Sequence, residues 1–116
     1  MASKTIEMYR GDYLSFTISV VDTNGDALNI ANYSILFTVK VNNDDDSNAL
    51  QKSSSSSTQI SKTSPTTGEF TVYIDSADTT NLTPGDLFYD AQITSSDSKS
   101  YTVLAGTFRI LTDITR

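Results

Sequence analysis

Apolar and polar residues alternate with a period of two along most of this chain, and no segment keeps helical spacing for long. The alternating runs predict about seven or eight short strands, with turn residues about every 8–12 positions. These runs lie at 6–8, 14–20, 35–41, 49–52, 58–62, 70–74, 87–94 and 101–110. The pattern is typical of an all-β protein, and it predicts a small antiparallel β-sandwich.

Residues between the runs predict where the chain turns. Asn24-Gly25 is a strong two-residue turn signal, and Pro65 and Gly68 bracket another turn. The segment Asp75-Ser76-Ala77-Asp78 begins and ends with a carboxylate that can cap backbone amides, so we expect a single capped helical turn there.

The first turn of the chain contains the tripeptide Arg10-Gly11-Asp12, which matches a motif read by cell-adhesion receptors. Three-residue matches arise by chance in about one or two chains per hundred of this length, so a turn is the favoured interpretation. A three-residue hairpin loop would place Met8 opposite Leu14 and Ile6 opposite Phe16, with all four on one face. We therefore expect a hairpin whose loop uses the backbone freedom of glycine.

The last two runs predict a second hairpin. Its apolar positions pair Ile93 with Val103 and Ala91 with Ala105, which centres the loop near Ser98.

Beyond Ala105 the apolar positions of this hairpin change from odd to even numbers, so one extra residue must enter the strand. Gly106 is the expected site of a β-bulge. The register past it pairs Tyr89 with Phe108 and Leu87 with Ile110.

The same register predicts that Phe88 and Arg109 lie opposite each other on the outer face. The simplest interpretation is an exposed cation–π pair, worth about 0.5–1 kcal/mol. The alternative is a contact point for a partner protein, because aromatic and arginine side chains dominate interface energetics. Phe88 and Arg109 are therefore the candidate partner-contact residues.

The length of 116 residues suits one domain spanning positions 1–116. Residues 43–57 include three consecutive aspartates and a serine run with few apolar anchors, so we expect a mobile polar loop there. Asp44, Asp45 and Asp46 are adjacent rather than at the alternate positions of a calcium loop, which favours a solvated loop over a metal site.

The inventory of reactive side chains argues against an enzyme. The chain has no histidine and no cysteine, and its glutamates are isolated, so we expect no catalytic residues, metal or cofactor. The net charge of −6 with scattered basic residues argues against nucleic acid and anionic membranes as partners. No signal peptide follows the first methionine, so we expect synthesis in a cytoplasm.

Several segments in order resemble the small immunoglobulin-like virion proteins of tailed bacteriophages, in particular the N-terminal domain of the phage baseplate upper protein. The resemblance runs through YRGDYLSFTISVVDTNGDALNIANYSILFTVK, SNALQKS, TGEFTVYI, LTPGDLFYDAQI and YTVLAGTFRILTDITR. It implies an immunoglobulin-like, non-enzymatic sandwich that docks onto other virion proteins. Family members often carry a further receptor-binding or fibre region, and the resemblance does not extend to such a region.

Two classes of function follow. The first is a virion structural protein, associated with the tail or baseplate or, alternatively, decorating the capsid. The second is a module that binds carbohydrate or a host surface, because small sandwiches often carry sugar sites. The absence of tryptophan from the chain favours the first class, since tryptophan is the best side chain for stacking on sugar rings.

Overall fold

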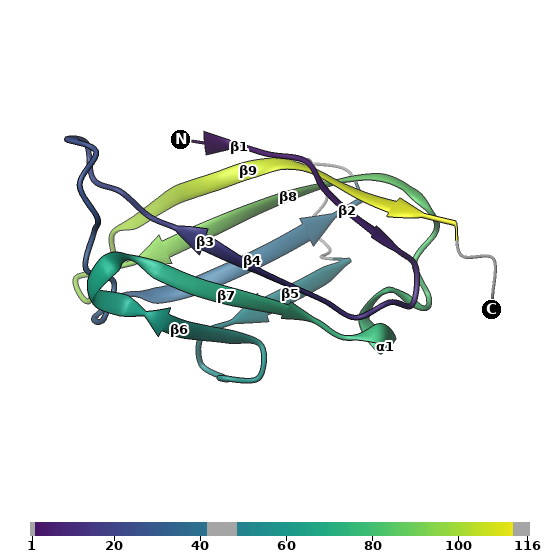
Figure 1. Cartoon of the computed structure of the whole chain (residues 1–116), viewed down its shortest axis with the longest axis horizontal. Helices are drawn as coiled ribbons and strands as arrows, with labels where there is room; N and C mark the ends of the chain where they lie inside the picture. Colours follow the sequence, from purple (N-terminus) through teal and green to yellow (C-terminus); the bar gives the residue numbers. More distant parts are fainter. Residues whose placement is uncertain (1, 42–48, 113–116) are drawn as a thin grey trace.

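The computed structural model describes residues 2–41 and 49–112, which form two β-sheets packed face to face (Figure 1). The larger sheet has six strands in the order β1-β9-β8-β4-β5, and β2 also pairs with β9. Its strands are β1 (Ala2–Ser3), β2 (Ile6–Tyr9), β4 (Ser34–Lys40), β5 (Leu50–Ser53), β8 (Gly85–Thr94) and β9 (Ser100–Leu111). The smaller sheet has the order β3-β7-β6, with β3 (Leu14–Ser19), β6 (Ile60–Ser64) and β7 (Glu69–Ile74). The predicted all-β fold with two sheets is confirmed.

A single hydrophobic core lies between the sheets. Phe37 on β4 is fully buried, and its ring centroid lies 5.5 Å from that of Phe16 on β3. Within its own sheet, Phe37 also contacts Tyr89 at 5.4 Å and Phe108 at 6.4 Å. Edge-to-face and tilted aromatic pairs add to the free energy of apolar burial. Phe37 therefore connects the two layers.

The N-terminal strand departs from the predicted antiparallel arrangement. Both β1 and β2 run parallel to β9, with Ala2 beside Leu104 and Ile6 beside Phe108. These two strands are pieces of one N-terminal strand that is interrupted between Ser3 and Ile6. The larger sheet is therefore mixed.

The predicted hairpin around the Arg-Gly-Asp tripeptide is wrong, although the turn itself is present. Strand β2 belongs to the larger sheet and β3 to the smaller one, so the turn carries the chain between layers. Gly11 adopts a φ of 83°, and the Asp12 amide donates to the Tyr9 carbonyl at 3.1 Å. The inner faces of both sheets point at the same core, so the same alternation fits two strands paired in one sheet and two strands that face each other across the core.

Most of the local turn predictions are confirmed. Gly25 has a φ of 84°, and Gly68 has a φ of 79° after the 3-10 helix η1 (Pro65–Thr67). The helical turn α1 (Ser76–Thr79) has a capping box in which Asp75 and Asp78 each bind the other's backbone amide. These features form from contacts within a few residues, so the sequence alone predicts them.

The expected register of the hairpin between β8 and β9 is wrong. Leu87 faces Phe108, two residues from the predicted Ile110, and Ala91 faces Leu104, one residue from the predicted Ala105. The irregularity predicted at Gly106 lies instead beside Val103, which is skipped in the pairing. This position lets Leu104 enter the core, and a leucine side chain buries more apolar surface than the expected Ala105.

The same shift changes the partners of the other predicted pairs. Ile93 faces Tyr101 rather than Val103, and Tyr89 faces Gly106 rather than Phe108. The loop of this hairpin centres on Asp97, one residue before the expected position.

Gly106 is needed for a different reason from the predicted bulge. A Cβ atom at this position would overlap the carbonyl group of Lys4, which lies against it at the interruption between β1 and β2. The Lys4 amide donates to the Ala105 carbonyl at 3.3 Å, and the Tyr89 hydroxyl donates to the Lys4 carbonyl at 2.6 Å. The missing side chain thus lets the N-terminal strand approach β9 closely.

The expected mobile loop at 43–57 falls only partly within the described residues. Its second half contains β5 and a turn in which the Ser56 amide donates to the Ser53 carbonyl at 3.3 Å. Asp44, Asp45 and Asp46, for which the sequence favours a solvated loop over a calcium site, lie outside the described residues.

Candidate functional site

The two predicted contact residues lie on the solvent-facing side of the larger sheet, which we call the outer face. Side chains of four strands point outward there. They are Glu7 and Tyr9 from β2, Thr38 and Lys40 from β4, Asp86, Phe88 and Asp90 from β8, and Thr107 and Arg109 from β9. The outer face thus combines two exposed aromatic rings with charges of both signs.

Phe88 lies outward on β8, as predicted, with 44% of its surface exposed. It faces Thr107 on β9 and Lys40 on β4. The predicted pairing with Arg109 is wrong, because the register of β8 and β9 differs from the expected one by two residues. Phe88 is an exposed apolar side chain in the middle of the sheet.

Arg109 binds two carboxylates instead of the phenyl ring. Its Nε donates to Asp86 Oδ1 at 2.8 Å, and its Nη1 lies 3.9 Å from Glu7 Oε2. The hydrogen bond and charge of Arg109 lower the pKa of Asp86, and Asp86 in turn raises the pKa of Arg109. The three side chains link β2, β9 and β8 across the outer face.

A shallow hollow of about 270 Å³ lies beside Phe88 and reaches Asp90 and Lys40. Partial burial raises the pKa of Asp90, and the nearby charge of Lys40 opposes that shift. The hollow brings one carboxylate and one amine together without a second carboxylate or a nucleophile paired with a base. Within residues 2–41 and 49–112, no group of three metal-ligating side chains comes together.

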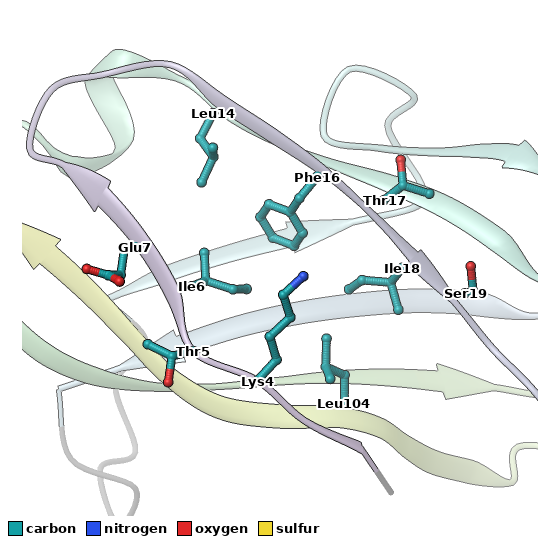
Figure 2. A pocket seen from close by; sticks show the side chains of 10 residues that line it. All are labelled: Lys4, Thr5, Ile6, Glu7, Leu14, Phe16, Thr17, Ile18, Ser19 and Leu104. Carbon is teal, nitrogen blue, oxygen red and sulfur yellow. The ribbon is translucent and has the colours of Figure 1, made fainter.

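A second concave surface lies between the two sheets, where β2 and β3 leave a groove of about 360 Å³ (Figure 2). Apolar side chains from both layers line it. They are Ile6 from β2, Leu14, Phe16 and Ile18 from β3, and Leu104 from β9. The side chain of Lys4 extends across this groove toward β3. The sequence contained no signal for the groove, because alternation does not reveal which strands are edges.

A third concave surface of about 530 Å³ lies at one end of the molecule. Two tyrosines, Tyr33 and Tyr101, line it together with Val21, and Tyr101 is 51% exposed. Asp22 is also at this surface, and its Oδ1 accepts the amides of Asn24 and Asp26 at 2.9 and 3.1 Å.

No helix in the described part of the chain is long and apolar enough to cross a membrane.

Comparisons with known proteins leave the family of this chain open. No family model and no curated protein matches the chain. A solved structure of a family 123 glycoside hydrolase from Clostridium perfringens is similar over 100% of this chain, with a TM-score of 0.45 and 15% identity. The chain corresponds to only 24% of the length of that hydrolase. A likeness this distant carries no argument about activity.

Proposed function

We propose that this chain is a non-enzymatic structural protein of a tailed bacteriophage virion, which docks onto other virion proteins at the tail or baseplate. The finer fold assignment, an immunoglobulin-like sandwich, belongs to the same proposal. Synthesis takes place in the host cytoplasm, and the assembled virion is the site of action.

The observation that carries the proposal is the exposed Phe88 at the middle of the outer face. Exposed aromatic side chains with charged neighbours are typical of protein interfaces, where the aromatic ring provides much of the binding energy. Phe88 has the cation of Lys40 on one neighbouring strand, and the ion pair of Arg109 and Asp86 lies next to it. This combination suits protein–protein docking better than chemistry, because the hollow beside Phe88 has neither a second carboxylate nor a nucleophile paired with a base.

The proposal is tested by finding the chain in purified particles and measuring its copy number by mass spectrometry. The resemblance to baseplate proteins leads us to expect a low copy number, set by the symmetry of the tail. A copy number matching that of the major capsid protein would instead establish the alternative, capsid decoration. Absence from purified particles would overturn both.

The role of the outer face is tested by Phe88→Ser in an assembly assay. We expect the folded variant to be incorporated at least about tenfold less well, as for a central interface aromatic. Tyr101→Ser is the matched control, because Tyr101 is similarly exposed but lies at the end of the molecule. Equal incorporation of the two variants would exclude Phe88 as an anchor.

The hollow lined by Tyr33 and Tyr101 favours a second candidate function, the binding of a host-surface glycan. Tyrosine rings provide apolar faces on which sugar rings stack, and Thr23 and Thr102 add hydroxyl groups at the same surface. Glycan-array binding that Tyr101→Ala abolishes and Phe88→Ala leaves intact would support this function. An array without any bound glycan would exclude it.

A further inference from the structure

Among the strands of residues 2–41 and 49–112, β3 is an edge strand with a strand neighbour on one side only. It pairs with β7, and the Val20 amide just past its end donates to the Gly68 carbonyl at 2.9 Å. Backbone groups of an antiparallel strand point alternately to its two sides. Even-numbered residues therefore bond toward β7, and the amides and carbonyls of Ser15, Thr17 and Ser19 point to the open side.

Strand β3 itself has none of the sequence features that usually prevent strand addition. The strand sequence LSFTIS contains no charge and no proline, and it pairs with β7 without a bulge. Natural edge strands generally carry at least one such feature, because an open edge is a template for another strand. Strand β3 is six residues long, which is the length of an ordinary strand.

The groove beside β3 provides places for the side chains of an added strand. Leu14 and Phe16 are only partly buried, and they face Ile6 and Leu104 across the gap (Figure 2). Phe16 also contacts Phe37, so the floor of the groove is continuous with the core. Its volume of about 360 Å³ lies in the range of about 300–1,000 Å³ that is typical of ligand pockets.

Lys4 and Glu7 are the two charged residues that line the groove, and Glu7 points away from the gap and pairs with Arg109 on the outer face. The side chain of Lys4 extends into the gap between β2 and β3, and it forms no ion pair with another residue in the described ranges (Figure 2). The backbone of Lys4 is held by the Ala105 carbonyl and the Tyr89 hydroxyl. A fixed backbone with a free ammonium group at an apolar groove favours a ligand with a carboxylate.

We propose that this groove binds an extended segment of a partner protein, which adds a strand to the open edge of β3. The segment alternates apolar and polar residues and carries a carboxylate that pairs with the Lys4 ammonium group. Main-chain hydrogen bonds to Ser15, Thr17 and Ser19 provide affinity, and the groove selects apolar side chains at alternate positions. This surface is separate from the outer face, so the inference goes beyond the docking role proposed for Phe88.

A second copy of this chain is a poorer occupant on electrostatic grounds. Each copy carries a net charge of −6, so self-association brings like charges together. A β3-to-β3 pair would also leave the Lys4 ammonium group of each copy without a carboxylate on the added strand, because residues 14–19 contain no acid.

The first test measures the binding of fluorescein-labelled nine-residue peptides to the purified chain by anisotropy. The peptides alternate valine and threonine, with one glutamate moved through successive positions, and glutamine and lysine versions serve as comparisons. We expect at least one glutamate peptide to bind about tenfold more tightly than its glutamine version. If no glutamate peptide binds, or if all three versions bind equally, the proposal is overturned.

The second test shows whether the peptide binds as a strand. N-methylation of the alternate residues that face β3 should abolish binding, whereas N-methylation of the other alternate set should leave it intact. Equal losses from both sets would overturn strand addition. This test uses the unaltered chain, so it does not depend on the folding of a variant.

Two variants of the chain test the same contacts from the other side. Lys4→Glu should reverse the preference from glutamate to lysine peptides, and Lys99→Glu, at a distant exposed loop, should leave it unchanged. Ser15→Pro removes an amide on the open side, so it should abolish peptide binding. The variant should still fold, because proline is tolerated in an edge strand where the missing amide faces solvent. Ser76→Pro is its control, since proline suits the first residue of a helix such as α1.

Size-exclusion chromatography of the chain alone tests whether a second copy of the chain occupies the open edge of β3. We expect a monomer. A dimer that Ser15→Pro dissociates would show that a second copy fills the edge, and it would overturn the partner-segment proposal. These measurements use the purified chain and peptides only, so their outcome is independent of whether particles contain the protein.

Discussion

Arg109 shows how a single side chain can organise the outer face. Its guanidinium group lies between Asp86 on β8 and Glu7 on β2, and it forms a hydrogen bond with the first and a longer ion pair with the second. Exposed ion pairs contribute little to stability, since water and salt screen them. These ion pairs instead fix the position of the Arg109 side chain, which is directed to the carboxylates and leaves the ring of Phe88 exposed. They also shift the pKa values of Asp86 and Arg109.

We expect Arg109→Gln to raise the pKa of Asp86 toward its ordinary value, because the variant removes the hydrogen-bonded cation that lowers it. In the native protein this lowered pKa means that the ionised Asp86 stabilises the fold at pH values above the pKa that Asp86 has in the unfolded chain. The stabilisation is lost as pH falls through the folded-state pKa.

An NMR titration of the Asp86 carboxyl carbon measures this change directly. Lys99→Gln is the control, because Lys99 lies near Asp97 in the hairpin loop and should not affect Asp86. An unchanged pKa of Asp86 in Arg109→Gln would show that the pair does not persist in solution.

Among the elements, the short helical turn α1 is held by side-chain contacts with two distant parts of the chain. The Asp78 carboxylate accepts the Asp75 amide at 2.7 Å and lies 2.7 Å from the ammonium group of Lys52 on β5. Next to it, the buried Thr79 hydroxyl accepts the Gly11 amide at 2.8 Å. A helix of four residues is not stable on its own, so these contacts with β5 and with the turn after β2 keep it folded.

We expect Asp78→Ala to lower the free energy of unfolding by about 3–5 kcal/mol, because it leaves the buried ammonium group of Lys52 without a partner. The side chain of Lys52 is only 6% exposed. Urea denaturation followed by circular dichroism provides the measurement.

Lys52→Met is the matched variant for the same ion pair. It removes the buried cation but keeps both the apolar stem and the Asp78 cap, so we expect less than half of the Asp78→Ala loss. If the two variants lose equal stability, the cost does not come from an unpaired buried charge.

At the scale of the whole molecule, the two sheets share one core, and the aromatic side chains of Phe16 and Phe37 meet across it. The N-terminal strand lies beside β9 in the larger sheet, so the first and last strands of the described chain are neighbours. Because most contacts join residues distant in sequence, neither sheet has an independent core, and we expect both to unfold together.

Phe37→Ala should therefore destabilise the whole fold by about 3–5 kcal/mol and lower the denaturation midpoint of both sheets equally. Phe88→Ala makes the same chemical change at a 44% exposed position and should cost no more than about 0.5 kcal/mol. Amide exchange during denaturation reports each sheet separately. Two transitions with different midpoints would contradict a shared core.

The predictions from sequence were most successful where the cause is local. The alternation of β3, β4, β7 and β8, the glycines at 11, 25 and 68, and the Asp75–Asp78 capping box are all present. Each depends on side chains and dihedral angles within a few residues, which are visible in one sequence. The outward positions of Phe88 and Arg109 follow from the same alternation.

Pairing and register could not be predicted in this way. Alternation indicates which side of a strand is buried, but both sheets bury the same core, so it does not assign a strand to a sheet. For this reason β2 was expected to pair with β3. The bulge was predicted at Gly106 but lies beside Val103. Its position depends on whether Leu104 or Ala105 fits the core better, which the alternation does not show.

The sequence by itself determined an all-β chain, its turns, its capped helical turn and its lack of histidine and cysteine. Only the tertiary structure decided that β2 joins β9, that Lys4 packs on Gly106, and that an apolar groove opens beside the free edge of β3. Local features depend on neighbouring residues, whereas edges and grooves depend on which strands are left unpaired after the whole chain has packed.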